Sequence, residues 1–313
     1  MNLFVNKRFS SRLVWLLSTL AAALVCAALR RWQLNSAFEA GAGLPIPGAQ
    51  SSVILACVLV MAAAWFVLLA LGQPVSKRPW TEGQAHRWDL VFLDAGDPVY
   101  PILVVLAAFL ALAAAPVLLP MALNQWSAYQ AAVQSGLTPP SSNGVLSAAT
   151  ALGALLAFLG LLQMGRDGLH PGRRGKGGFS AALPGIAGCI WLMESFRAHA
   201  ANPVLWDYAP LLLSIVCGML FFMDFAGMSA GAARPTRLLW LAAMTLVLSA
   251  VSLTSAAAEG GWHDLLLLAA QGLAAAAVLW RLPPKLESPP QPRGISIPQR
   301  TGESSIQEET DDE

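Results

Sequence analysis

The chain is poor in charge. Only 12% of its 313 residues are Asp, Glu, Lys or Arg, whereas soluble domains carry roughly 25%. Hydrophobic residues make up 56% of the chain. The formal net charge of +1 provides no attraction for nucleic acid or for an acidic partner. This composition excludes an ordinary soluble domain and is typical of a membrane protein.

Paired cysteines and enzyme motifs are also missing. The four cysteines lie in apolar runs without a C-x-x-C spacing, so they predict neither a disulfide framework nor a metal site. The chain has no H-E-x-x-H, G-x-S-x-G, Walker A or dinucleotide-binding glycine pattern. The nearest approach to a membrane metalloprotease, Glu194-x-x-Arg197 with His199-x-x-Asn202, has a different spacing. We therefore expect no cofactor and do not expect an enzyme.

Long apolar runs are what the chain has in abundance. A helix of about 20 residues crosses a hydrocarbon core of about 30 Å, and lipid forces each segment to satisfy its own backbone hydrogen bonds. We predict an all-α, polytopic membrane helix bundle over residues 1–281 with eight spans. The expected spans are 13–29, 53–71, 100–123, 145–162, 180–200, 205–228, 238–257 and 262–280.

The end of the chain differs from the rest. From Leu282 onward the chain has six prolines and an acidic terminus. Such a composition cannot bury a core, so we expect residues 282–313 to form a disordered cytoplasmic tail.

The distribution of basic residues predicts the orientation. Of the 19 Lys and Arg residues, only Arg30, Arg31 and Arg197 fall on one side of the eight expected spans, which leaves 16 on the other. Basic residues concentrate in cytoplasmic loops. We therefore expect both termini in the cytoplasm of a bacterium, with the bundle in its inner membrane and the lipid bilayer as its surroundings.

One polar stretch stands between the fifth and sixth expected spans, at residues 191–208. Glu194 lies about 21 Å along the fifth span at 1.5 Å per residue, still inside the hydrocarbon, where an ionised side chain is costly and usually functional or paired. Arg197 follows it by three residues, and Asp207 begins the sixth span. The same outer side also receives the further candidate ligand-binding residues Arg30, Arg31, Glu39 and Asn202.

Three interpretations of this stretch remain open. Glu194 and Arg197 form a structural pair that pins the fifth helix to the first, or they line an outward-facing pocket for a small, zwitterionic ligand, or Glu194 points into the aqueous interface. Because an unpaired ion at this depth is costly, we expect at least one contact between helices to join Arg30 or Arg31 to Glu194 or Asp207, with the first helix packed against the fifth or sixth.

Other residues carry smaller expectations. Asp224 should pair with Arg234 or Arg237 near the inner boundary, and Gln271 should form a hydrogen bond between helices. Pro116 and Pro120 should kink the third span where it leaves the bilayer.

A pattern after the first span carries a resemblance. Arg31-Trp-Gln33-Leu34-x-x-x-Phe38-Glu39-x-x-x-Gly43-Leu44-Pro45 is similar to a recurrent class of hypothetical multi-pass bacterial membrane proteins, and the Asn202-Pro203 corner adds to the likeness. No activity attaches to that class, so the resemblance implies only the architecture.

Two functions remain open. The leading hypothesis is the binding or transport of a small polar solute through the outward-facing pocket. The alternative is a non-catalytic sensor or assembly partner that acts on another protein through the cytoplasmic loops or the tail.

Overall fold

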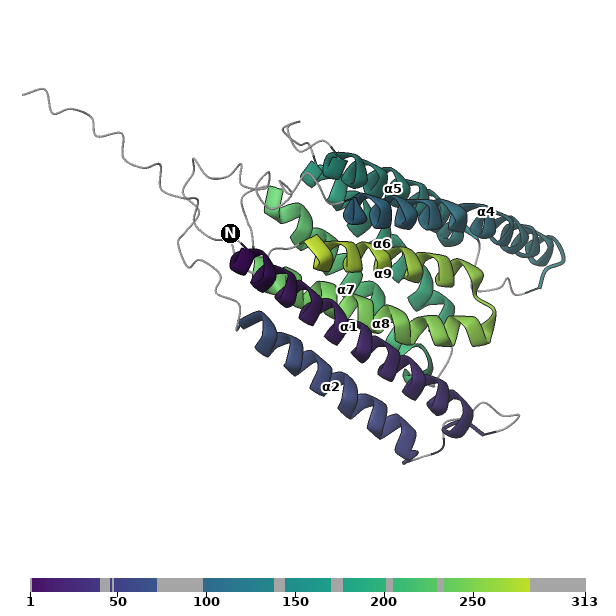
Figure 1. Cartoon of the computed structure of the whole chain (residues 1–313). Coiled ribbons are helices and arrows are strands. Elements are labelled where there is room, and N and C mark those ends of the chain that lie inside the picture. Colours follow the sequence, from purple (N-terminus) through teal and green to yellow (C-terminus); the bar gives the residue numbers. More distant parts are fainter. Residues whose placement is uncertain are drawn as a thin grey trace, which may run out of the picture.

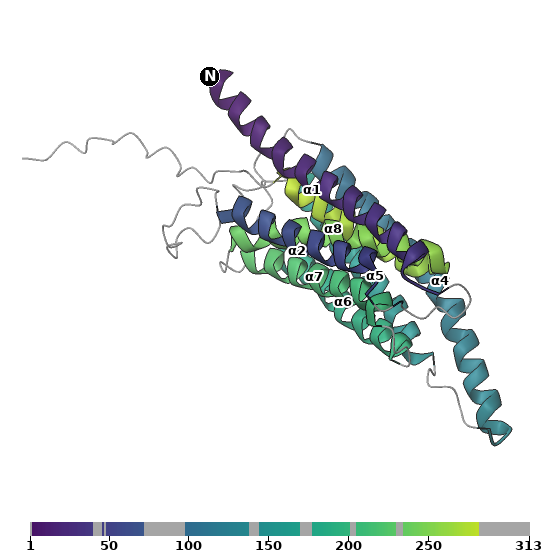
Figure 2. The ribbon, with the colours of Figure 1, turned by 90° about the horizontal axis from the view of Figure 1, so that it is seen from below.

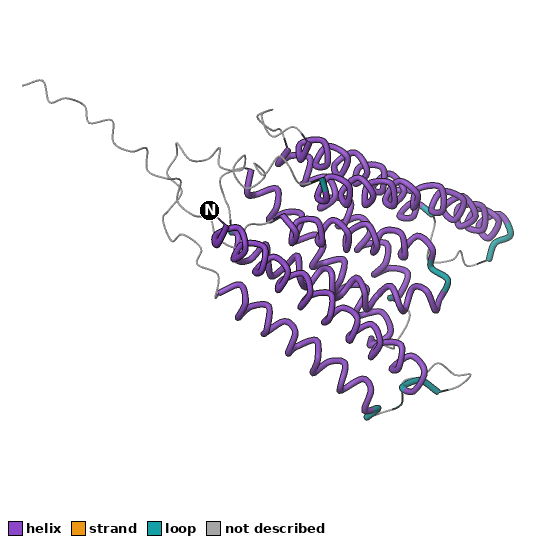
Figure 3. Tube along the Cα trace, in the orientation of Figure 1, coloured by secondary structure: helices purple, strands orange, loops and turns teal. Residues whose placement is uncertain are grey.

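The computed structural model describes residues 2–39, 46, 48–71, 98–137, 144–169, 177–200, 205–229 and 234–281. All regular structure in these ranges is helical (Figure 3). The eight helices are α1 (Asn2–Ser36), α2 (Gln50–Leu71), α4 (Val99–Gln134), α5 (Val145–Leu169), α6 (Gly177–His199), α7 (Leu205–Ser229), α8 (Pro235–Glu259) and α9 (Trp262–Arg281). The predicted fold class, an all-α membrane helix bundle, is confirmed.

Six helices form a closed ring in which each packs against the next: α4, α5, α6, α7, α8 and α9, with α9 returning to α4. Helix α1 lies outside this ring against α8, and α2 lies against α1 and α8 (Figure 1). We call the end of the bundle that holds the C-terminal ends of α1, α4, α6 and α8 the outer end, following the predicted orientation.

Seven of the described helices are long and apolar enough to cross a membrane, so the chain is a multi-pass membrane protein. The remaining helix, α6, contains Pro184, Glu194 and Arg197, and these residues lower its hydropathy. It nevertheless packs along both α5 and α7. Its 23 residues extend over about 34 Å, enough to span the hydrocarbon.

Two helices run further than the apolar runs indicated. Helix α4 continues through Pro116 and Pro120 to Gln134, whereas the expected span ended at residue 123. Helix α5 continues to Leu169, beyond its expected end at residue 162. In Figure 2, α4 extends past the outer ends of the neighbouring helices.

Small residues allow the helices of the ring to approach closely. A Cβ atom on Gly160 of α5 would lie 2.5 Å from the carbonyl oxygen of Ser180 and 2.7 Å from Cδ of Pro184, both in α6. The two backbones therefore touch at this point. Because lipid provides no hydrophobic drive between helices, such close packing is a principal source of association.

Two sequence-based predictions lie outside the described residues: the tail 282–313 and the Asn202-Pro203 corner. They remain predictions.

Candidate functional site at the outer end

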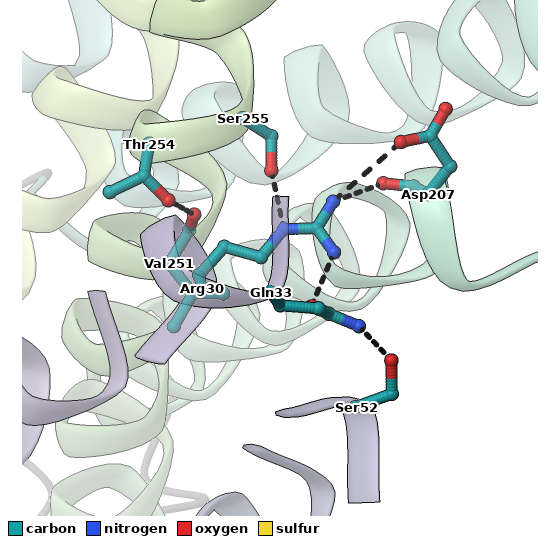
Figure 4. Close-up of polar contacts among 7 residues, drawn as sticks. All are labelled: Arg30, Gln33, Ser52, Asp207, Val251, Thr254 and Ser255. Carbon is teal, nitrogen blue, oxygen red and sulfur yellow. Dashed lines mark hydrogen bonds and ion pairs between the residues drawn. The ribbon is translucent and has the colours of Figure 1, made fainter. Parts of the chain in front are cut away.

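A completely buried arginine joins three helices at the outer end. Arg30 of α1 has an exposed fraction of 0%. Its Nε donates to Oγ of Ser255 in α8 (2.8 Å), and its Nη1 donates to Oε1 of Gln33 (2.7 Å). Its Nη2 donates to the carbonyl oxygen of Asp207 in α7 (2.7 Å) and lies 3.8 Å from the Asp207 carboxylate (Figure 4). These bonds offset much of the cost of burying the charge.

The same cluster attaches α2 to the bundle. Gln33 donates through Nε2 to Oγ of Ser52 in α2 (2.8 Å), and Ser36 donates to Oγ of Ser51 (3.0 Å). The expected contact between Arg30 and Asp207 is thus confirmed. The expected packing of the first helix against the fifth or sixth is wrong, because α1 lies mainly on α8. Arg30 reaches α7 with its long side chain instead.

Glu194 belongs to a second polar group at the outer end, and its side chain is buried inside the ring of helices. Its exposed fraction is 6%, and Oγ of Ser147 in α5 is 3.3 Å from its Oε1. The Ser147 hydroxyl also lies 3.0 Å from Oε1 of Gln125 in α4. His199, His263 and Asp264 are close enough to act electrostatically on the Glu194 carboxylate. Side chains of α5 and α9, and through Ser147 a side chain of α4, therefore surround this buried acid of α6.

The other candidates from the sequence are more peripheral. Arg197 is exposed although Glu194 is buried, and Ser147 provides a contact to the Glu194 carboxylate. Arg31 and Glu39 are also exposed. Asn202 lies outside the described residues. The structure brings Arg30 and Asp207 together, and it places Glu194 in a separate group.

Three residues of the outer end escaped the sequence analysis. Glu259 ends α8 and interacts electrostatically with Asp207, His199 and Arg30. His263 and Asp264 lie in the first turn of α9, and Nε2 of His263 is 3.5 Å from Oδ1 of Asp264. The predicted topology already placed all three on the outer side, so counting every acid and histidine on that side would have found them.

A narrow cavity lies in the middle of the ring. It has a volume of about 40 Å³, space for about three water molecules. Five helices contribute to its wall, including Thr150, Trp191, Gly218 and Gln271. Trp191 lies one turn below Glu194 and donates through Nε1 to Oδ1 of Asp264 (2.9 Å). Trp191 therefore belongs both to the cavity wall and to the polar group above it.

Gln271 provides the polar contact at mid-membrane, about 14 Å along α9. Its Nε2 donates to Oγ of Ser214 in α7 (2.8 Å) and to Oγ of Ser249 in α8 (3.0 Å), which confirms the expected bond between helices. Its Oε1 packs against Gly218, where a Cβ would collide with it. The amide is thus held with its donors engaged and its side chain in the cavity wall.

The inner end is fixed by two cationic contacts. Nε of Arg237 lies 2.7 Å from Oδ2 of Asp224, confirming one of the two expected partners. Arg281, with 3% exposure, lies 5.0 Å from the ring centre of Tyr100 and donates to the carbonyl oxygen of Gly168 (3.4 Å). That carbonyl belongs to the C-terminal turn of α5, where a cation is stabilising.

Within the described ranges, no three His, Cys, Asp or Glu side chains are grouped so that they could hold a metal ion. No protein-family model, no curated protein and no solved structure matches the chain.

Proposed function

We propose that the protein binds a small polar solute at the outer end of the bundle and passes it toward the central cavity. The observation that carries this proposal is the position of Glu194: a buried carboxylate among four helices, directly above the cavity whose wall includes Trp191. A charge kept at this depth is a functional candidate by default. The proposed setting is the inner membrane of a bacterium.

The chemistry of the outer end favours a solute with a positive charge or several hydrogen-bond donors. Glu194, Asp207, Glu259 and Asp264 form two adjoining groups that interact electrostatically. The Arg30 guanidinium is engaged by Gln33, Ser255 and Asp207. A cationic solute would add positive charge beside the Glu194 carboxylate, whereas a purely anionic one would be repelled.

Trp191 is the proposed barrier between the outer site and the cavity. Its bond to Asp264 holds the indole between the Glu194 group and the cavity, on the path that the proposal requires. Transport would require that bond to break, so that the narrow cavity could widen between α5, α6 and α9. A solute that pairs with Asp264 competes directly with the indole N–H for the same carboxylate oxygen.

A stabilisation screen tests the proposal. Purified protein in detergent is heated with a panel of small cationic, zwitterionic and anionic solutes. We expect at least one cationic solute to raise the midpoint of unfolding, by mass action on the folded state. Glu194→Gln should abolish that rise. Glu39→Gln, the same change at an exposed acid on the same side, should keep it, and an unchanged rise in Glu194→Gln would contradict the proposal.

The second candidate is a non-catalytic sensor or assembly partner. The peripheral position of α2 supports it: only 17% of its span is buried, so most of this helix is open to other membrane components. The cytoplasmic loops and tail that would carry the signal lie outside the described residues. A panel in which no solute shifts the unfolding midpoint would favour this candidate.

A further inference from the structure

The outer part of α4 carries a stripe of exposed apolar side chains. Leu119, Leu123, Trp126 and Val133 have exposed fractions between 46% and 62%. With the partly exposed Gln130 they follow one another at intervals of four, three, four and three residues. This is the heptad spacing of a coiled-coil seam. We call these five residues the α4 seam.

The seam lies on the side of α4 that the bundle leaves uncovered: Leu118 and Ala122, on another side of the helix, are buried, whereas no residue from Leu123 to Leu137 is buried. The helix has 36 residues and is about 54 Å long at 1.5 Å per residue, against a hydrocarbon core of about 30 Å. Figures 1 and 2 both show its C-terminal part running beyond the neighbouring helices. The part that projects from the bundle is short, and a short isolated helix is only marginally stable in water. Packing against another surface normally stabilises such a segment.

We propose that the α4 seam pairs with the same seam of a second copy of this chain. Copies in one membrane share one orientation, so their α4 helices emerge in parallel and in the same register. The chain carries no charged residue from Pro98 to Gly165, so no like charges meet when two copies of the segment approach. The spacing that defines the seam is also the spacing that packs against itself.

Gln130 adds a specific element to this pairing. It is the one polar residue of the seam, flanked by Trp126 and Val133. In a parallel pair the two Gln130 amides face each other and can each donate to the other, as a single polar seam residue does when it sets register and oligomeric state. Confinement to one membrane raises the effective concentration of the copies, so a short seam is sufficient.

Disulfide cross-linking in native membranes tests the pairing. In a full-length background with Cys26, Cys57, Cys189 and Cys217 replaced by alanine, single cysteines are placed at Leu123, Trp126, Gln130 and Val133. Matched controls at the same height but on the opposite side of α4 are Asn124, Ala128 and Ala131. On oxidation we expect a homodimer several-fold more abundant at the seam positions than at the controls.

A charge substitution gives a second readout that does not depend on oxidation. Val133→Lys should convert the native-gel dimer to monomer, while Ala131→Lys should leave it intact. Equal cross-linking at seam and control positions, no homodimer at any position, or a cross-linked product with the mass of a different protein would each overturn the proposal.

Discussion

Arg30→Ala should lower the free energy of unfolding by about 3–5 kcal/mol, the range measured when one partner of a buried ion pair is removed. The guanidinium donates to Gln33, Ser255 and the backbone of Asp207, so its loss strands acceptors on three helices at once. Because α2 is attached partly through Gln33, we also expect the α1–α2 pair to loosen from the ring.

The neighbouring arginine is the matched control. Arg31 is exposed, so Arg31→Ala should change the free energy by no more than about 0.5 kcal/mol. Equilibrium unfolding in mixed detergent micelles, followed by circular dichroism, measures both variants. If Arg30→Ala and Arg31→Ala lowered the free energy of unfolding equally, the hydrogen bonds of Arg30 would contribute nothing to stability beyond its charge.

Gly160→Ala should destabilise the ring by roughly 1–3 kcal/mol, the usual cost of overpacking. The added methyl would meet the carbonyl oxygen of Ser180 at 2.5 Å, and a backbone atom cannot rotate out of the way as a side chain can. Helices α5 and α6 must therefore separate.

Gly153 lies on the same helix and faces the same neighbour. A Cβ there would be 3.5 Å from the nearest atom, Cα of Ala187, which is ordinary contact, so Gly153→Ala should be close to neutral. The same unfolding measurement compares the two variants. A Gly160→Ala protein as stable as Gly153→Ala would show that the close approach of α5 and α6 is not needed.

Much of the architecture follows from the sequence because lipid imposes simple rules. Apolar length predicts where helices cross, and the depth of Arg30 and Asp207 predicts that their charges meet at one end. Asp224 and Gln271 found expected partners for the same reason: a polar group in hydrocarbon has few alternatives.

Rotation and neighbour order are harder to predict. The spacing of Glu194 and Arg197 puts them near one another on a helix, but it does not say which side faces the ring. The structure turns Glu194 toward Ser147 and leaves Arg197 exposed. Likewise, topology puts α1 at the correct end without specifying that it lies against α8.

The length of α4 was missed for a different reason. Pro116 and Pro120 usually end or kink a helix in soluble proteins, whereas membrane helices tolerate proline because local adjustments satisfy the freed carbonyls. The segment beyond them lacks charge and contains the good helix formers Ala128, Ala131 and Ala132. The α4 seam could not be predicted from the sequence, because it extends beyond residue 123, where the helix was expected to end.

The central claim is that the charge of Glu194 serves a solute rather than the bundle. The most direct measurement is the unfolding free energy of solute-free Glu194→Gln beside the wild type. Glutamine keeps an acceptor for Ser147 and removes only the buried charge, so we expect a variant at least as stable as the wild type, as is usual where function opposes stability. A loss of more than about 1 kcal/mol, the scale of a typical hydrogen bond, would show instead that Glu194 holds the helices together.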